Sequence, residues 1–334
     1  MSKRILCIIL SIVITVAVIG CSKGAPATPL KRIAIGLSFA FKDSAYHFAL
    51  EDYLAKAADQ YAEKNGCEIS IISVSANKSA VQQEKDIESL LSKNIDVLLI
   101  YPQDAKAINK SISLAHSKNV PVIMYTRAAS ENGEQAEMYV GLDTFKQAYT
   151  TAVALFELMA KDKIEPQVLI LQGDMADENA VNRHNGFLEA VKQYDAEVLD
   201  IIQTNWDTEK AFQGLSSSLD KYPQSNCLLC AGDYLLSGIT PALKGKNRWF
   251  PYGNSEHIYF GSQDVLPTAI GLLQEGYIDY DTAADIWPIA QKTVQMVVAL
   301  ANKETIDRKS LLIEGRLVSK TNISTIENLW SRDY

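Results

Sequence analysis

Short apolar runs alternate along the chain with longer segments whose apolar residues recur every three or four positions. In the first pair, the run 33–37 precedes a segment in which Leu50, Leu54 and Tyr61 share one helical face. Through residue 125, this pattern predicts strands at 33–37, 68–74, 95–101 and 120–125 and helices at 45–64, 79–93 and 104–117. Near-continuous apolar strands between amphipathic helices are typical of a parallel sheet that is covered on both faces.

The pattern restarts near Met138 and runs to residue 313. It predicts strands at 138–141, 167–171, 198–203, 227–231, 258–261 and 311–313 and helices at 144–162, 177–194, 207–221, 234–243, 265–275 and 286–301. Two such runs predict an α/β protein with two doubly wound parallel-sheet lobes, and a single large α/β enzyme domain is the alternative. The length of 334 residues suits two domains of roughly 100–200 residues each.

The N-terminal segment resembles an export signal. Lys3 and Arg4 precede an apolar stretch, 5–19, that is shorter than the roughly 20 residues of a membrane-spanning helix. A basic start, a short apolar core and a small residue before the cut are typical of a secretory signal, expected here at 1–20. Gly20-Cys21 resembles a bacterial lipobox, so Cys21 is the expected lipidated residue and 21–30 a lipidated tether. An ordinary cleaved signal or an uncleaved anchor is the alternative.

Composition and missing motifs argue against several classes of protein. With 32 Lys+Arg against 40 Asp+Glu, the net charge is -8, and no basic surplus is present to neutralise nucleic-acid phosphates. The sequence contains no G-x-S-x-G, H-E-x-x-H or G-x-x-x-x-G-K-[ST] motif. An exported chain also meets no ATP or NAD pool, so we expect no enzyme, no cofactor and no metal. Cys227 and Cys230 share one predicted strand, where residues three apart face opposite sides, and are expected to be core thiols.

The residues that directly follow the predicted strands are the candidates for a binding site, because ligands of such folds bind at the carboxyl ends of the strands. They comprise 39–47 (FAFKDSAYH), 101–104, 125–127, 173–174 with 177–178, 205–207, 232–233 and 262–264, with Asp285 and Trp287 near the hinge. Aromatic rings that stack on sugar C–H faces, beside planar polar groups that bind hydroxyls, suit a polyhydroxylated small molecule. Asp104, Asp207 and Asp233 also stand where helix N-caps belong, and capping explains them at least as well.

Several segments, in their order and spacing, resemble the periplasmic-binding-protein type I family, ribose/galactose branch. The resemblance covers about 31–320 and rests on AKAAD (55–59), IDVLLIYP (95–102), VPVI (120–123) and RHNGF (183–187). It implies two lobes joined by a three-crossing hinge, with crossings near 141–143, 284–287 and 312–314. The implied lobes are 31–142 plus 286–312 and 143–285 plus 313–334.

The resemblance also implies which residues meet the ligand. The family's first-loop aromatics fall on Tyr46 and His47, its Asp-Arg pair on Thr126-Arg127, and its second-lobe aromatic on Trp206. Together with the residues after the strands, the expected ligand-binding set is Phe41, Asp43, Ser44, Tyr46, His47, Tyr101, Thr126, Arg127, Arg183, Trp206, Asp233, Gln263 and Asp285. Thr126 and Gly232 stand where the family has Asp and Asn, so a modified sugar, a polyol or another polar metabolite stays open beside a simple sugar.

The function that follows is capture of a sugar or sugar-like solute for an ABC permease by an extracytoplasmic lipoprotein, anchored to the cell membrane or in the periplasm. The protein is expected to be a monomer that binds no nucleic acid and closes its lobes on the ligand. The alternative is a ligand sensor of the same fold that signals to a membrane histidine kinase or chemoreceptor. A secreted hydrolase is disfavoured because the chain has no nucleophile elbow.

Overall fold

The computed structural model describes residues 31–334 except 131, 308 and 328. The expected signal peptide, the tether and the lipidation site at Cys21 lie outside these residues. Among the described residues, no helix is both long and apolar enough to cross a membrane.

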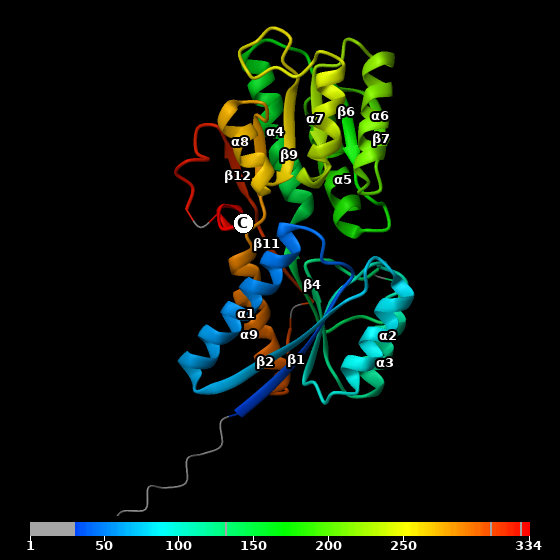
Figure 1. Ribbon diagram of the computed structural model, residues 1–334, viewed down its shortest axis with the longest axis vertical. Helices are drawn as coiled ribbons and strands as arrows, with labels where there is room; N and C mark the ends of the chain where they lie inside the picture. Colours follow the sequence, from blue (N-terminus) through cyan, green and yellow to red (C-terminus); the bar gives the residue numbers. More distant parts are fainter. Residues whose placement is uncertain (1–30, 131, 308, 328) are drawn as a thin grey trace, which may run out of the picture. The chain divides into compact units, whose positions relative to one another are not determined.

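The first sheet is parallel throughout and is covered by helices on both faces (Figure 1). Its strands, from edge to edge, are β11 (Ser310–Ile313), β5 (Met138–Leu142), β4 (Val122–Tyr125), β3 (Val97–Tyr101), β1 (Lys31–Phe39) and β2 (Cys67–Ser75). Helices α1 (Ala45–Asn65) and α9 (Ile286–Ala301) lie side by side on one face, and α2 (Ala80–Leu91) and α3 (Asn109–Ser117) cover the other. Both faces are therefore buried, as the apolar strands require.

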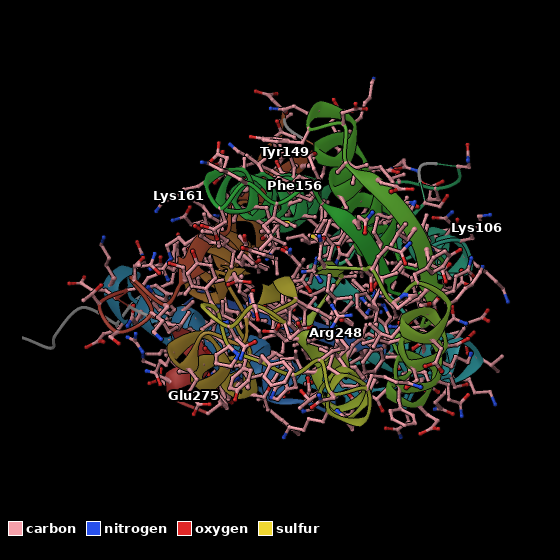
Figure 2. The ribbon with its side chains drawn as sticks, turned by 90° about the horizontal axis from the view of Figure 1, so that it is seen from above. Lys106, Tyr149, Phe156, Lys161, Arg248 and Glu275 are labelled. Atoms are coloured by element: carbon pink, nitrogen blue, oxygen red, sulfur yellow. The ribbon has the colours of Figure 1, made fainter. Side chains whose placement is uncertain are left out.

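The second sheet repeats this plan with one antiparallel edge strand. Its order is β12 (Arg316–Ser319), β10 (Tyr280–Ala283), β9 (Tyr259–Asp264), β8 (Cys227–Cys230), β6 (Gln167–Gln172) and β7 (Glu197–Gln203). One face packs on α4 (Thr144–Lys161) and α5 (Glu178–Gln193), and the other on α6 (Thr208–Lys221), α7 (Leu236–Gly245) and α8 (Pro267–Glu275). Phe156 of α4 lies in the core between this sheet and the helices α4 and α5, and Tyr149 of the same helix packs against that core (Figure 2). The predicted two-lobed α/β fold is confirmed.

Local structure differs from the predicted elements at four places. The strands β10 and β12 were not predicted, and β12 runs antiparallel to β10. Helix α3 begins at Asn109 because the Asp104 carboxylate accepts the N–H groups of Lys106 and Ala107 and holds a turn before it. Strand β9 continues through Asp264, three residues beyond the predicted end. Cys227 and Cys230 lie on opposite faces of β8, in different cores, as the strand period predicts.

The chain passes between the lobes after β5, after β10 and between β11 and β12. At the last passage the backbone runs very close to β10, since a Cβ on Gly315 would lie 2.7 Å from the Ala283 carbonyl oxygen. The C-terminal segment then returns to the first lobe. Leu329 belongs to a second-lobe core, whereas Trp330, which opens the short helix η2 (Trp330–Arg332), belongs to a first-lobe core. The expected boundaries placed 313–334 wholly in the second lobe, and the structure differs there because Trp330 finds its apolar partners on α1.

A buried ion pair, His257 with Asp279, stabilises the second lobe. His257 Nε2 lies 2.9 Å from Asp279 Oδ2, and its Nδ1 lies 2.7 Å from the Phe250 carbonyl oxygen. Because both ring nitrogens face acceptors, the doubly protonated imidazolium satisfies both contacts. Burial acts to lower the pKa of His257, but the hydrogen bond and charge of Asp279 outweigh it and raise the pKa.

Replacing His257 by glutamine should lower the free energy of unfolding by about 1–3 kcal/mol, because the amide keeps one donor and loses the charge. A raised folded-state pKa contributes its full stability below the unfolded value, about pH 6.5, and that contribution disappears as pH rises through the folded pKa. Urea unfolding at several pH values should therefore show a gap between wild type and variant that narrows with rising pH. A gap that widened above neutrality would contradict this account.

Candidate functional site

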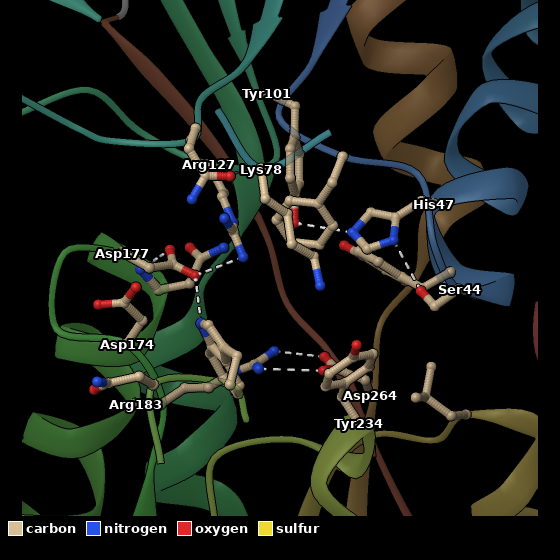
Figure 3. Close-up of a pocket in the computed structure, with 17 residues that line it drawn as sticks. Ser44, His47, Lys78, Tyr101, Arg127, Asp174, Asp177, Arg183, Tyr234 and Asp264 are labelled. Atoms are coloured by element: carbon tan, nitrogen blue, oxygen red, sulfur yellow. Dashed lines mark hydrogen bonds and ion pairs between the residues drawn. The ribbon is translucent and has the colours of Figure 1, made fainter. Parts of the chain in front are cut away.

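A cavity of about 160 Å³ lies where the carboxyl ends of the strands in both lobes meet (Figure 3). Tyr101 ends β3 and Arg127 follows β4 on the first-lobe side, and Asp264 ends β9 on the second-lobe side. Doubly wound sheets bind ligands at this edge, so the cavity lies where the fold predicts a site.

The first-lobe wall is built from aromatic rings around a buried histidine. The His47 ring packs edge-on against Phe41 at 4.7 Å and Tyr101 at 5.5 Å between centroids. His47 Nδ1 lies 2.9 Å from Ser44 Oγ, and Nε2 lies 3.3 Å from the Tyr101 hydroxyl. Burial lowers the pKa of His47 below its usual value, so the ring is neutral at pH 7. Beside the cationic Lys78 and Arg127, which also line the cavity from the first lobe, the wall presents apolar ring faces and a few hydroxyl groups.

Arg127 reaches across the cavity to Asp177 of the second lobe. Its Nη2 lies 2.9 Å from Asp177 Oδ2, and both side chains are largely buried. The guanidinium also stands over the Tyr101 ring, 4.6 Å from its centroid, where a cation is favoured electrostatically. Asp177 Oδ2 accepts a second hydrogen bond from Trp206 Nε1 at 3.1 Å. One carboxylate thus orients a guanidinium from one lobe and an indole from the other.

Arg183, on α5, forms a bidentate pair with Asp264 (Figure 3). Its Nη1 also donates to the Ala231 carbonyl oxygen at 2.7 Å, and its Nη2 donates to Gln147 Oε1 at 2.9 Å. The Arg183 side chain is buried, with 6% of its surface exposed. Such fork-to-fork pairing fixes the plane of both groups, so Arg183 and Asp264 form a rigid polar edge of the cavity.

The Trp206 ring lies in space that two glycines leave free. A Cβ on Gly173 would lie 2.3 Å from Trp206 Cζ2, so a side chain there would displace the indole. A Cβ on Gly232 would lie 3.3 Å from Trp206 Cζ3 and 3.4 Å from Arg183 Nη1. The Asn that the family resemblance places at Gly232 would therefore compete for the space that Trp206 and Arg183 fill.

Eight of the thirteen expected residues line the cavity. They are Phe41, Ser44, Tyr46, His47, Tyr101, Arg127, Arg183 and Trp206. The other five do not line it, and the three carboxylates among them have partners elsewhere. Asp43 pairs with Lys78 at 2.8 Å, and Asp285 pairs with Arg316 of β12. Asp233 accepts hydrogen bonds from Ser262 and from the backbone of Leu266.

Thr126 and Gln263 also stand away from the cavity. Thr126 is 2% exposed with a left-handed backbone, φ 60°, and its carbonyl oxygen accepts from Asn179 Nδ2 of the second lobe at 2.9 Å. Its backbone therefore positions Arg127, while its side chain is buried. Gln263 is fully buried within β9, on the face opposite Ser262 and Asp264, since side chains alternate along a strand.

Nine further residues line the cavity and were not in the expected set. They are Lys78, Gln103, Asp174, Asp177, Asn179, Asn205, Tyr234, Asp264 and Leu266. Five of these, Gln103, Asp174, Asp177, Asn205 and Asp264, stand among the residues that follow predicted strands, so a uniform use of that rule finds them. The other four, Lys78, Asn179, Tyr234 and Leu266, lie a few residues further along the segments that follow β2, β6, β8 and β9, beyond the ranges that were singled out.

The fold and the cavity define a two-lobed binding protein. The model of the periplasmic binding protein domain matches residues 35–305, and the chain belongs to this family of binding proteins, which are not enzymes. The D-xylose-binding periplasmic protein of Haemophilus influenzae is 25% identical over 76% of this chain and 74% of its own length. The ribose import binding protein of Bacillus subtilis is 24% identical over 65% of this chain and 68% of its own length.

Solved structures share the fold. An ABC transporter periplasmic solute binding protein from Actinobacillus succinogenes with bound D-allose superposes with a TM-score of 0.78 at 20% identity, over 88% of this chain and all of that one (100%). A solute binding protein from Bacillus halodurans with bound myo-inositol gives 0.75 at 19% identity, over 91% and 99%.

Proposed function

We propose that this protein captures one neutral sugar or polyol in the cavity and delivers it to an ABC importer. The observation that carries the proposal is the pairing of an aromatic wall, Phe41 and Tyr101, with the rigid Arg183–Asp264 edge. Ring faces suit sugar C–H groups, and paired planar side chains donate to and accept from neighbouring hydroxyls. The relatives that bind xylose, ribose, allose or myo-inositol support the same class of ligand.

The charge balance and the volume of the cavity narrow the range of ligands that it could bind. Three cationic side chains line the cavity, Lys78, Arg127 and Arg183, and three carboxylates, Asp174, Asp177 and Asp264, balance them. Both buried arginines already have a carboxylate partner, so an anionic ligand would find no free buried cation among the described residues that line the cavity. The volume of about 160 Å³ is below the roughly 300–1,000 Å³ of sites for drug-sized ligands. A single monosaccharide or polyol fits this space better than an oligosaccharide.

The proposed mechanism is closure of two lobes around the ligand. We propose lobes of 31–142 plus 286–312 and 143–285 plus 313–329, with 330–334 returning to the first lobe, and a lipid on Cys21 that keeps the protein at the membrane as a monomer. The hydrogen bond from Asn179 to Thr126 and the Arg127–Asp177 pair form only when the lobes meet. A ligand that contacts both walls therefore shifts the equilibrium toward the closed form that a permease recognises.

A thermal-shift screen of the mature protein tests the proposal. The panel should contain ribose, xylose, allose, fructose, xylitol and myo-inositol, with glucuronate and glucosamine as charged controls. A cognate ligand at 100 times its Kd should add about 2.7 kcal/mol to the free energy of unfolding, and scattering should show compaction. No shift with any neutral sugar or polyol, or a larger shift with glucuronate, would refute the proposal. Capture of a histidine kinase rather than a permease from native membranes would refute the transport step.

A further inference from the structure

A strained turn at the end of β9 presents two cavity residues, Asp264 and Leu266. Asp264 has φ 94° and Val265 has φ 49°, so two consecutive non-glycine residues lie in the left-handed region. This conformation is a genuine outlier for a β-branched residue such as Val265. It persists only where the surroundings hold it in place. The turn matters to the site because Asp264 is the partner of Arg183.

Two buried carboxyls hold this turn by its backbone. Asp281 Oδ1 accepts the Val265 N–H at 3.2 Å, and Asp233 Oδ2 accepts the Leu266 N–H at 2.8 Å. Asp233 Oδ1 also accepts from Ser262 Oγ at 2.5 Å. Asp233 is 1% exposed and Asp281 is fully buried. Neither carboxyl lines the cavity, so both act on the site only through the turn.

The placement of the two buried carboxyls favours a proton between them. Asp281 stands opposite Ser262 in the register of β10 and β9, and Ser262 Oγ donates to Asp233, so the two carboxyls lie close together. Two carboxylates could only accept and could not bond to each other. Ionised, Asp281 Oδ2 is a buried atom with no partner. With a proton on Asp281, Oδ2 can donate a hydrogen bond to the Asp233 carboxylate, which links the two side chains.

The surroundings of the pair favour keeping that proton. Asp264 on β9 adds a third carboxylate nearby, and Arg183 from α5 compensates Asp264 rather than the pair. Cys230 on β8 also lies at the pair, and burial raises the pKa of its thiol to about 12, so it stays neutral. Burial likewise raises the pKa of Asp233, to about 7, and burial with the charge of Asp233 raises that of Asp281 further.

We propose that Asp233 and Asp281 share one proton and together act as positioning residues, holding the 264–266 turn so that Asp264 meets Arg183 and the ligand. The inference rests on the proposed function of the cavity and adds a pH response to it. A carboxyl whose pKa is higher in the folded state than in the unfolded state stabilises the fold fully at a pH below its unfolded-state pKa. This stabilisation is lost as the pH rises through its folded-state pKa. Ligand affinity should therefore fall as pH rises through neutrality, when a second buried negative charge pushes the carboxyls apart and releases the turn.

The test compares wild type with Asp281→Asn and Asp281→Ala. Asparagine can accept from Val265 N–H and donate to Asp233, so it mimics the protonated acid without titrating. Calorimetric titration of the sugar or polyol identified in the screen, between about pH 5.5 and about pH 8.5, should show wild-type affinity falling about tenfold or more at the alkaline end, since one unit of pKa difference corresponds to a tenfold effect. Asp281→Asn should keep the affinity that wild type has at low pH and lose the alkaline fall. Asp281→Ala should bind weakly at every pH.

Unfolding without ligand separates failure of this inference from failure of the proposed function. The free energy of unfolding of wild type should fall as pH rises through neutrality, and the fall should be smaller in Asp281→Asn, which keeps every histidine. If no sugar or polyol binds but this difference persists, the proposed ligand class is wrong and the shared proton stands. An alkaline fall in affinity or stability that is identical in wild type and Asp281→Asn would overturn the inference.

Discussion

Replacing Arg183 by methionine should remove ligand binding and lower the free energy of unfolding by about 3–5 kcal/mol, the usual cost of removing one partner of a buried ion pair. The guanidinium fills a buried position between Asp264, Gln147 and the Ala231 carbonyl oxygen. Methionine has similar length and no donor, so Asp264 would lose its cationic partner. Urea denaturation measures the loss of stability, and calorimetry should show affinity reduced by about 100-fold or more.

The double variant Arg183→Met/Asp264→Leu separates the two effects. Removing both charges should recover most of the stability, because an apolar pair of similar volume often replaces a buried ion pair at little cost. Binding should stay lost, because the cavity would have no paired donor and acceptor at that edge. Arg248→Met is a matched control, since Arg248 donates to the Pro223 and Ser225 carbonyl oxygens and does not line the cavity. Normal ligand affinity in Arg183→Met would contradict the assignment of this edge to the ligand.

The elements that could be predicted were those whose apolar residues show, in the sequence alone, which positions are buried. The strands β1, β3 and β8 are nearly continuous apolar runs, and their flanking helices show a clear apolar face. Strand β10 reads YDTA, and the polar groups of its buried Thr282 meet partners that are distant in sequence. Thr282 Oγ1 meets Thr151 at 2.6 Å, and its carbonyl oxygen accepts from Gln147. A local pattern cannot contain this information, so β10 was not predicted.

The residues of the candidate site also divide into those that the sequence could predict and those that it could not. Residues that follow a strand directly, such as Tyr101 and Arg127, reach the cavity because the sheet edge places them there. Thr126 stands beside Arg127 in sequence, but its carbonyl oxygen accepts from Asn179 of the second lobe and its side chain is buried. The family resemblance places a carboxylate at 126, whereas here a carboxylate of the second lobe, Asp177, pairs with Arg127. A pairing between residues of different lobes cannot be predicted from a local sequence pattern, because it depends on how the two lobes meet.

Replacing Trp330 by alanine should lower the free energy of unfolding by about 3–5 kcal/mol, the range for large aromatic-to-alanine changes in a core. Trp330 is 2% exposed, and its ring packs at 5.8 Å from that of Tyr46, which lines the cavity. Its Nε1 has no hydrogen-bond partner, so its contribution is packing. The segment is also fixed on α1 by the bond from the Tyr53 hydroxyl to Asp333 at 2.8 Å. Losing the ring should therefore loosen both the C-terminal return and the Tyr46 wall.

The Trp330→Ala variant should also bind ligand more weakly than wild type. A matched control replaces a tryptophan that does not contact Tyr46. Trp249 stacks on Tyr277 at 4.5 Å between centroids, is only partly buried, and does not line the cavity. Trp249→Ala should cost less stability and leave affinity unchanged. A double-mutant cycle of Trp330→Ala with Tyr46→Ala, read by calorimetry, should give a coupling of about 0.5–3 kcal/mol in binding, as contacting residues do. Additive effects would mean that the C-terminal return stabilises the first lobe without supporting the cavity, because Tyr46 would then hold its position unaided.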